Sequence, residues 1–380
     1  MRDFFRAFLR FLREADVFLL LLCLISSIIG LLLISSVLSK SAGSETTVQV
    51  VALVIGFALF ILFSYVDIDI IADKLVFLFI ASALFLLTLF FWGVGFGETG
   101  NRAWLRFFGI GIQPAEVTKI TFIIIIAKMI ANHKERKSLN TFVSLMQIAA
   151  VFLLFFGLIV GISYDLGSAL VYLFIFVALL FIGGVKLRWL ALGGALMAVV
   201  SPLAWYRFLS VKQKDRILAP FIPDVIDPLR KGVLWQSDRS VQAIMSGGFS
   251  GQGLGRGRMT QGGIIPAQST DFIFSAAGEE LGFIGCMLIV LLLMAMIFRC
   301  IYVGVKSNNS LGMLVCSGIA AMIIAHTFEN IGMCLGMLPV IGISLPFFSY
   351  GGSSLVTLMA AAGIVSGIKM RPKPARYRLI

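Results

Sequence analysis

Long apolar runs recur along the chain, separated by short polar stretches. Residues 17–34 form eighteen consecutive uncharged positions, and a run of that length crosses about 30 Å of hydrocarbon as a helix. The fourth run is the least typical, because it is short and contains Lys119 and Lys128. The pattern predicts transmembrane helices near 17–38, 48–66, 75–92, 117–131, 142–163, 166–185, 189–206, 274–298, 310–332 and 353–369.

The composition agrees with an all-α polytopic membrane protein of about ten transmembrane helices. Hydrophobic residues make up 59% of the 380 positions and charged residues 13%, about half the charge of a soluble domain. A membrane β-barrel would show short alternating segments instead. We expect the first run to be kept, because it lacks a clear small-x-small cleavage site and more spans follow it. Five isolated cysteines without a CxxC pair indicate neither zinc nor a disulfide framework.

Clusters of Lys and Arg set the orientation, because such residues favour the cytoplasmic side. With an even number of spans, all the clusters fall on one side, so both termini are predicted to be cytoplasmic. Residues 1–16 also resemble a basic amphipathic helix on the inner leaflet, and residues 370–380 form a basic tail. The net charge of +12 is largely this topology signal and does not indicate nucleic acid. The clusters comprise Arg2, Arg6, Arg10 and Arg13; Lys134, Arg136 and Lys137; Lys186 and Arg188; and Lys369, Arg371, Lys373, Arg376 and Arg378.

Three stretches then face outward within one domain spanning residues 1–380. They are residues 93–116, the large loop 207–273 between the seventh and eighth spans, and residues 333–352. The last stretch is rich in Gly and Pro but largely apolar, which suits non-helical backbone buried at membrane depth.

The large loop carries nine basic residues and four aspartates. Arg and Lys bind phosphates, so the loop predicts either a site for an anionic headgroup or contact with outer-leaflet lipid phosphates. Its glycine-rich segment 247–255 permits close approach to a ligand or an anion nest, or it simply forms turns. The basic residues are Arg207, Lys212, Lys214, Arg216, Arg230, Lys231, Arg239, Arg256 and Arg258.

Asp271 lies where this loop meets the eighth span. A carboxylate at such a boundary can accept a proton, although with Thr270 it can equally cap the following helix, and the pattern alone favours the cap. Asp165, in a very short turn, can cap the helix that begins at residue 166. Glu279 and Glu280 suit the first turns of the eighth helix.

Glu116 and Lys119 lie three positions apart, so they share a helix face and can neutralise each other within the apolar zone. Arg102 and Arg106 add positive charge just before them. His326 and Glu329 share a face of the ninth span, where we favour a polar contact between helices. The sequence holds no HExxH motif, Ser/His/Asp order or metal-ligand cluster.

These motifs, taken together, resemble the SEDS family of cell-wall proteins, which includes RodA, FtsW and SpoVE. They follow the family's order through most of the chain, and the form of residues 340–350 is closer to RodA. The matching segments are Gln113-Pro114-Ala115-Glu116-Val117-Thr118-Lys119, Asp165-Leu166-Gly167-Ser168, Gln242-Ala243-Ile244, Gly251-Gln252-Gly253-Leu254-Gly255, Thr270-Asp271-Phe272-Ile273-Phe274, Glu279-Glu280-Leu281-Gly282 and Ser349-Tyr350-Gly351-Gly352-Ser353-Ser354.

The resemblance implies a peptidoglycan glycosyltransferase that polymerises lipid II during cell elongation, at the outer face of the cytoplasmic (inner) membrane. It also implies a class B penicillin-binding protein as transpeptidase partner, within an elongation complex of other membrane proteins. The family's essential loop aspartate corresponds to Asp271, so the resemblance implies a catalytic role for this residue rather than a cap. Its fourth-helix pair corresponds to Glu116 and Lys119.

Two departures from the family pattern limit the mechanism. Many relatives carry Pro-Glu-x-His before Thr-Asp-Phe, whereas this chain has Pro266-Ala267-Gln268-Ser269, so neither that glutamate nor that histidine can act here. Tyr164 stands where the family has a proline before Asp165.

The expected reaction is an inverting displacement. Asp271 acts as general base on the acceptor GlcNAc 4-hydroxyl, and undecaprenyl diphosphate leaves. A divalent cation, Mg²⁺ or Mn²⁺, can assist, but the sequence shows no dedicated ligands. Two alternatives remain, a lipid II flippase and a non-catalytic scaffold for a penicillin-binding protein. The expected substrate-binding residues are Glu116, Lys119, Arg102, Arg207, Arg216, Arg239, Ser349, Gly351 and Gly352, supported by Asp165, Thr270 and Gln242.

Overall fold

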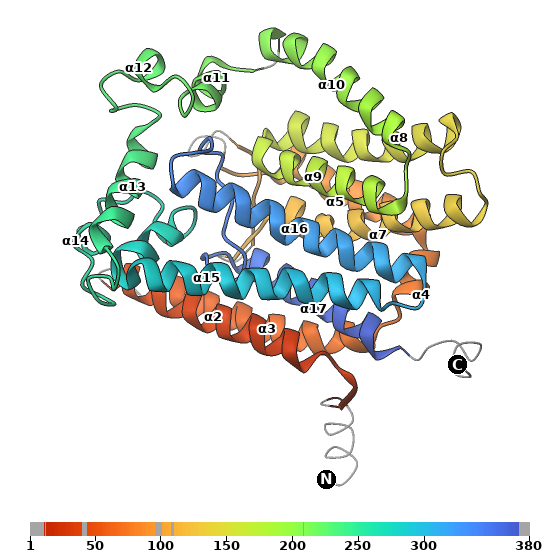
Figure 1. The fold of residues 1–380 in the computed structure, drawn as a ribbon, viewed down its shortest axis with the longest axis horizontal. Helices are drawn as coiled ribbons and strands as arrows, with labels where there is room; N and C mark the ends of the chain where they lie inside the picture. The colour runs from red at the N-terminus through yellow and green to blue at the C-terminus, as the bar shows by residue number, and fades with distance from the viewer. Residues whose placement is uncertain are drawn as a thin grey trace.

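The computed structural model describes residues 11, 13–39, 44–95, 101–107, 110–207 and 209–371. Most of the long helices in this part of the chain run side by side (Figure 1). They are α2 (Val17–Val37), α3 (Ser44–Tyr65), α5 (Leu75–Trp92), α7 (Pro114–Glu135), α8 (Phe142–Leu158), α9 (Leu166–Gly183), α10 (Leu187–Arg207), α15 (Ile273–Val305), α16 (Ser310–Cys334) and α17 (Gly352–Met370). The predicted amphipathic helix 1–16 and basic tail 370–380 fall largely outside the described residues.

The predicted polytopic helical fold is confirmed. Among the described helices, nine are long and apolar enough to cross a membrane. The tenth long helix, α7, carries Glu116, Lys119 and Lys128 within its 22 residues. It packs against α5, α9, α16 and α17, and its residues Phe122–Ala127 are almost completely buried. Glu116 and Lys119 are buried and therefore surrounded by protein rather than lipid, whereas Lys128 is only partly buried and pairs with Asp73. These charges explain why an apolar-run criterion finds this helix weakest.

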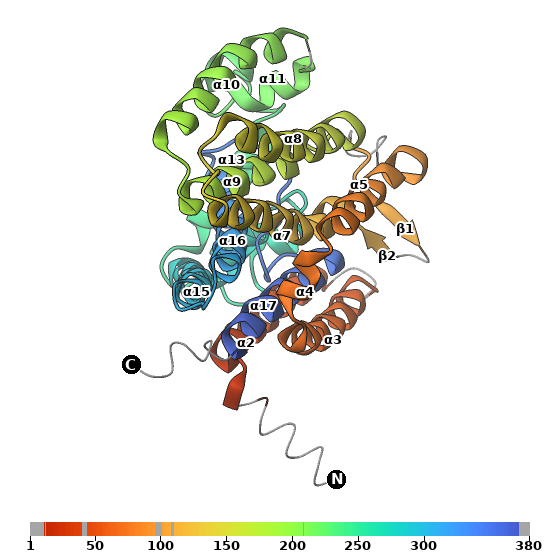
Figure 2. The same cartoon turned by 90° about the vertical axis from the view of Figure 1, so that its right-hand side faces the viewer.

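Residues 207–273, which we predicted as a loop, contain four short helices. They are α11 (Val211–Leu218), α12 (Pro223–Ile226), α13 (Trp235–Gly247) and α14 (Arg258–Gln261), and α13 packs on α15. Other short elements are α4 (Ile68–Asp73), the π-helical turn η1 (Ile159–Ser163) after α8, and an antiparallel hairpin of β1 (Leu105–Phe107) and β2 (Ile110–Ile112). Helices α10, α11 and α12 lie at one edge of the molecule (Figure 1), where α10 and α11 also stand apart in the turned view (Figure 2). The side chains of α10 are mostly exposed.

The glycine-rich segment 247–255 packs against α15, which is interrupted at Gly282 by backbone angles of φ 67° and ψ −162°. A Cβ atom on Gly251 would lie 2.2 Å from the Glu280 carbonyl oxygen, and one on Gly247 would lie 2.0 Å from that of Gly278. The Gly253 N–H donates to the Glu280 carbonyl at 2.9 Å. Gly247 and Gly251 are therefore needed for the close approach of two backbones. Gly248, Gly253 and Gly255 have positive φ angles, in agreement with the turn interpretation, and a role of the segment in ligand binding stays a prediction.

Residues 335–351 form the non-helical backbone predicted for 333–352. The part from 343 to 349 is largely buried inside the bundle, whereas Leu335 and Met337 are exposed. Leu345, Phe347 and Phe348 are buried. On α2, a Cβ atom at Gly30 would lie 2.7 Å from the Cα of Phe348. Gly30 precedes the end of α2 by seven residues, which corresponds to a depth of about 10 Å along that helix.

Candidate active site

A cavity of about 450 Å³ lies within the bundle, between the N-terminal turns of α7 and α9, the C-terminal half of α16, residues 342–352 and the loop before α15. Segments that are far apart in the sequence meet there. Six of the predicted site residues line it: Glu116, Lys119, Thr270, Asp271, Gly351 and Gly352.

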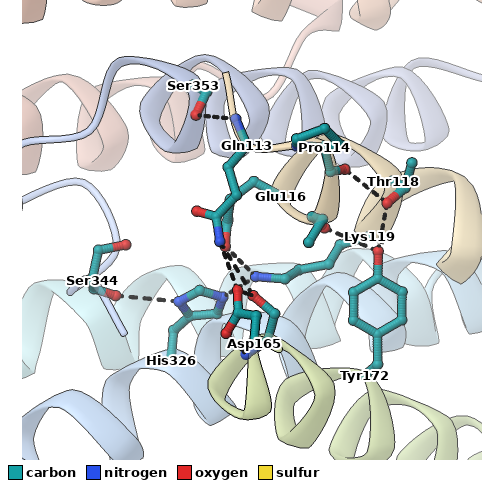
Figure 3. A network of polar contacts seen from close by, with 12 residues as sticks. Gln113, Pro114, Glu116, Thr118, Lys119, Asp165, Tyr172, His326, Ser344 and Ser353 are labelled. Atoms are coloured by element: carbon teal, nitrogen blue, oxygen red, sulfur yellow. Dashed lines mark hydrogen bonds and ion pairs between the residues drawn. The ribbon is translucent and has the colours of Figure 1, made fainter. Parts of the chain in front are cut away.

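Glu116 and Lys119 form a buried ion pair at one wall of this cavity. The Lys119 ammonium lies 2.5 Å from a Glu116 carboxylate oxygen and 2.8 Å from Nε2 of His326 on α16 (Figure 3). The Lys119 side chain is fully buried. The predicted neutralisation within one helix face is therefore present, with His326 as a third member from another helix.

The second ring nitrogen of His326 fixes its tautomer. Nδ1 lies 3.2 Å from the carbonyl oxygen of Ser344, which can only accept a hydrogen bond, so Nδ1 carries the proton. Nε2 of the neutral ring then accepts from Lys119. The polar contact between helices that we favoured for His326 is confirmed.

Asp165 caps α9, as predicted, and organises the entrance to α7. Its carboxylate accepts from the Ser168 N–H at 3.0 Å and from the Ser168 hydroxyl at 2.8 Å. It also accepts from the Gln113 side-chain amide at 2.9 Å (Figure 3). Gln113 is the residue before Pro114, where α7 begins. Asp165 thus connects the starts of two helices beside the cavity.

Asp271 is held through its backbone. The Asn330 side-chain amide donates to the Asp271 and Ile343 carbonyl oxygens, each at 2.7 Å. The Ser349 hydroxyl donates to the Thr270 carbonyl at 2.6 Å. No side-chain hydrogen bond caps α15, whose N-cap residue is Phe272, so the cap interpretation of Asp271 is wrong. Its carboxylate is left to line the cavity.

Burial raises the pKa of Asp271 to about 6. The negative charge of Asp165 acts in the same direction, whereas the Thr270 side chain and the positive charge of Arg216 lower the pKa. A carboxylic acid with such a pKa is largely ionised at neutral pH and is still basic enough to take a proton from a substrate.

The predicted basic residues are distributed unevenly. Arg106, on β1, lines the cavity, while Arg102 donates its backbone N–H to the Ser163 carbonyl at 2.9 Å. Arg216, on α11, influences Asp271 by its charge. Arg207 and Arg239 are outside the cavity lining.

Arg207 is the last residue of α10, and Arg239 donates to the Gln242 side chain at 2.8 Å on the surface of α13. Ser349 acts on the loop that carries Asp271 rather than lining the cavity. The side chain of Lys212 is outside the described residues.

The sequence did not predict the site roles of two residues, Asn330 and His326. Asn330 was not singled out, and His326 was assigned only a contact between helices. They lie four positions apart, so they share one face of α16. That spacing was a usable signal, but the partners of both side chains are on other elements and depend on the tertiary fold.

A protein-held divalent cation lacks a donor set here. In the described part of the chain there is no group of three His, Cys, Asp or Glu residues placed to hold a metal ion. Glu116 is paired with Lys119, and Asp165 is occupied by Gln113 and Ser168.

A family profile and several curated proteins match this chain, and all of them belong to one family. The profile of the FtsW/RodA/SpoVE family, described as "Cell cycle protein", matches residues 15–373. Peptidoglycan glycosyltransferase MrdB of Escherichia coli (strain K12) is 32% identical over 274 residues, which cover 72% of each chain. Probable peptidoglycan glycosyltransferase FtsW of Geobacter sulfurreducens (strain DL-1 / KN400) is 34% identical over 297 residues, covering 77% of each chain.

Solved structures agree with this relationship. A chain from a peptidoglycan synthase complex that coordinates polymerization and crosslinking matches with a TM-score of 0.79 and 27% identity, over 96% of this chain and 99% of that one. The rod shape determining protein RodA of Thermus thermophilus shares the fold, with a TM-score of 0.69 and 24% identity over 94% of this chain and 97% of its own. From the sequence match and the shared fold, this chain belongs to the FtsW/RodA/SpoVE family.

Proposed function

We propose that this chain is a peptidoglycan glycosyltransferase that polymerises lipid II at the outer face of the cytoplasmic membrane. The observation that carries the proposal is the meeting of Asp271, a carboxylate with a raised pKa, and the buried ammonium of Lys119 in one cavity. A base and a cation are the two groups that transfer of a sugar from a lipid diphosphate requires. The activity named for the MrdB and FtsW relatives supports the same reaction.

In the proposed reaction Asp271 accepts the proton of the acceptor GlcNAc 4-hydroxyl. The hydroxyl oxygen forms a bond to the anomeric carbon of the donor as the bond from that carbon to the diphosphate oxygen breaks. The anomeric configuration inverts, and the bond's electron pair leaves with undecaprenyl diphosphate. One carboxylate is sufficient, because a diphosphate leaves without help from an acid.

Lys119 and Arg106 are the cavity cations placed to hold diphosphate oxygens. The exposed Arg207 and Arg216 and the half-buried Arg239 would act on the approach of an anionic lipid, by longer-range attraction. Mg²⁺ commonly binds phosphates with few protein ligands, so we propose that Mg²⁺ or Mn²⁺, if used, arrives on the substrate. It would neutralise charge on the leaving diphosphate.

The setting of the protein follows from the same proposal. Both termini would be cytoplasmic and residues 207–273 extracytoplasmic, in the inner membrane. The partner would be a class B penicillin-binding protein that crosslinks the strand, as polymerization and crosslinking are coordinated in the structurally similar synthase complex. A role in cell elongation with other membrane proteins rests on the RodA-like form of residues 340–350.

Polymerisation of lipid II by the purified protein in detergent tests this function. We expect glycan strands longer than the disaccharide unit, resolved by gel electrophoresis after the peptides are labelled. A flippase or a scaffold would give no polymer, because detergent provides neither a membrane to cross nor a partner enzyme. Absence of polymer from a monodisperse, folded preparation would reject the proposal in favour of one of these alternatives.

A further inference from the structure

His326 connects three separate parts of the cavity wall. It belongs to α16, its Nε2 accepts from Lys119 of α7 at 2.8 Å, and its Nδ1 donates to the Ser344 carbonyl of the non-helical segment at 3.2 Å (Figure 3). These two hydrogen bonds occupy both ring nitrogens, which leaves the ring no free nitrogen for a substrate. Only 3% of the residue is exposed.

The Lys119 ammonium has three N–H donors. One is directed to Glu116 and one to His326. In the described structure no third partner accompanies them, although Lys119 lines the cavity. The third donor is therefore available to a ligand there.

We propose that His326 is a positioning residue that fixes the Lys119 ammonium so that its third N–H meets a diphosphate oxygen of the substrate. The inference rests on the proposed function, since it assigns this N–H to that substrate. A lysine side chain is long and flexible, and one hydrogen bond to Glu116 leaves the ammonium free to rotate about that contact. The second acceptor is a rigid ring anchored on Ser344, so it removes this freedom.

Two amide substitutions separate the two contacts of the ring. In His326→Gln the side-chain oxygen reaches the place of Nε2, so Lys119 keeps its acceptor while the contact with Ser344 is lost. In His326→Asn the side-chain N–H₂ reaches the place of Nδ1, so Ser344 keeps its donor while Lys119 loses its acceptor. Neither amide can gain an additional proton at neutral pH, so neither can transfer a proton as a histidine can.

The experiment measures kcat/KM for lipid II polymerisation together with the melting temperature of each variant. We expect His326→Gln to stay within about threefold of wild type and His326→Asn to lose about 10- to 100-fold, the range for one hydrogen bond to a charged group. Thr327→Val is the matched control. The Thr327 hydroxyl is buried next to His326 on the same helix and has no hydrogen-bond partner in the described structure, so its removal should leave activity unchanged.

Other patterns would overturn the inference. An active His326→Asn with an inactive His326→Gln would assign the role to the Ser344 contact. Two active variants would make His326 dispensable, and two inactive ones would indicate proton transfer or ring packing instead.

The same pair in a Lys119→Met background gives a second measurement. If His326 acts through Lys119, the difference between Gln and Asn should disappear there. A difference that persists would show that His326 acts independently. A wild-type protein without polymerase activity would reject the proposed function itself, which is a different outcome from any of these.

Discussion

Replacing Asp271 by Asn keeps the size of the side chain and removes its ability to accept a proton from the acceptor hydroxyl. We predict that Asp271→Asn lowers the polymerisation rate by about 10²- to 10⁴-fold, as for loss of a general base. The melting temperature should not fall, because no side chain caps α15 and the amide removes a charge that burial disfavours. Initial rates of lipid II polymerisation and thermal unfolding of the same preparation check both parts. Near wild-type turnover by the folded variant would contradict the mechanism.

Thr270→Ala is the neighbouring control. The Thr270 hydroxyl donates to the Ala267 carbonyl at 3.3 Å, and the backbone contact of Thr270 with Ser349 is unaffected by the substitution. We expect this variant to keep most of its activity. A loss as large as that of Asp271→Asn would assign the effect to the local loop conformation.

The pKa of Asp271, about 6, predicts how activity depends on pH. The carboxylate is the active form, so kcat/KM should fall as pH decreases through about 6, by about tenfold per pH unit well below it. Stability should change in the opposite direction. A carboxyl whose pKa is higher in the folded state favours folding when protonated, and this contribution is lost as pH rises through 6. A pH–rate profile with parallel melting curves separates the two effects, and an acid limb that follows unfolding would contradict the assignment.

At the scale of elements, the Glu116–Lys119 pair links α7 to α16 through His326. Removing either partner leaves the other charge buried, which costs about 3–5 kcal/mol for a fully buried pair. We predict that Glu116→Gln and Lys119→Met both lower the melting temperature and that Lys119→Met lowers polymerisation more, because Lys119 also faces the substrate. Equal, mild effects on activity and stability would argue against a role in binding.

The break in α15 offers a test of the packing of segment 247–255. Gly282 has angles that are essentially restricted to glycine, so an alanine there costs about 1–3 kcal/mol. Its Cβ would also lie 2.3 Å from the Gly251 nitrogen. We predict that Gly282→Ala lowers the melting temperature by several degrees. Gly193→Ala on α10, where no atom lies within 4 Å of the added Cβ, should not; equal shifts would contradict the packing argument.

The long elements were predictable because each apolar run follows one simple requirement, that a helix satisfy its own backbone in lipid. Helix α13 was not, since its sequence Trp235–Gly247 mixes charges with apolar residues and its packing face is defined only by α15. The site shows the same division. Glu116 stood out as an ionisable residue in apolar surroundings, and the family resemblance, rather than the residue pattern, indicated a catalytic role for Asp271. The partners of Asn330 could not be predicted in this way, because they lie 59 and 13 residues away.

For the whole molecule, the proposed orientation predicts which surfaces a membrane-impermeant reagent reaches. In a cysteine-free version, Leu229→Cys in the outer loop should react with an impermeant thiol reagent on intact spheroplasts, because Leu229 is 75% exposed. Lys134→Cys, at the exposed end of α7, should react only after lysis. Labelling of Lys134→Cys alone before lysis would invert the topology.

The burial of charges on α7 has a consequence for how the protein is made. On insertion scales a lysine near the centre of a helix costs about 2.5–3.5 kcal/mol, and α7 carries Lys119 as well as Lys128, whose ammonium lies 2.7 Å from the Asp73 carboxylate. During synthesis, Asp73 is made before its partner Lys128, and Glu116 is made just before its partner Lys119. His326 follows about 200 residues later. Helix α7 must therefore enter the membrane beside the helices that were made before it. The Lys119 ammonium gains its second acceptor, His326, only after α16 has been inserted.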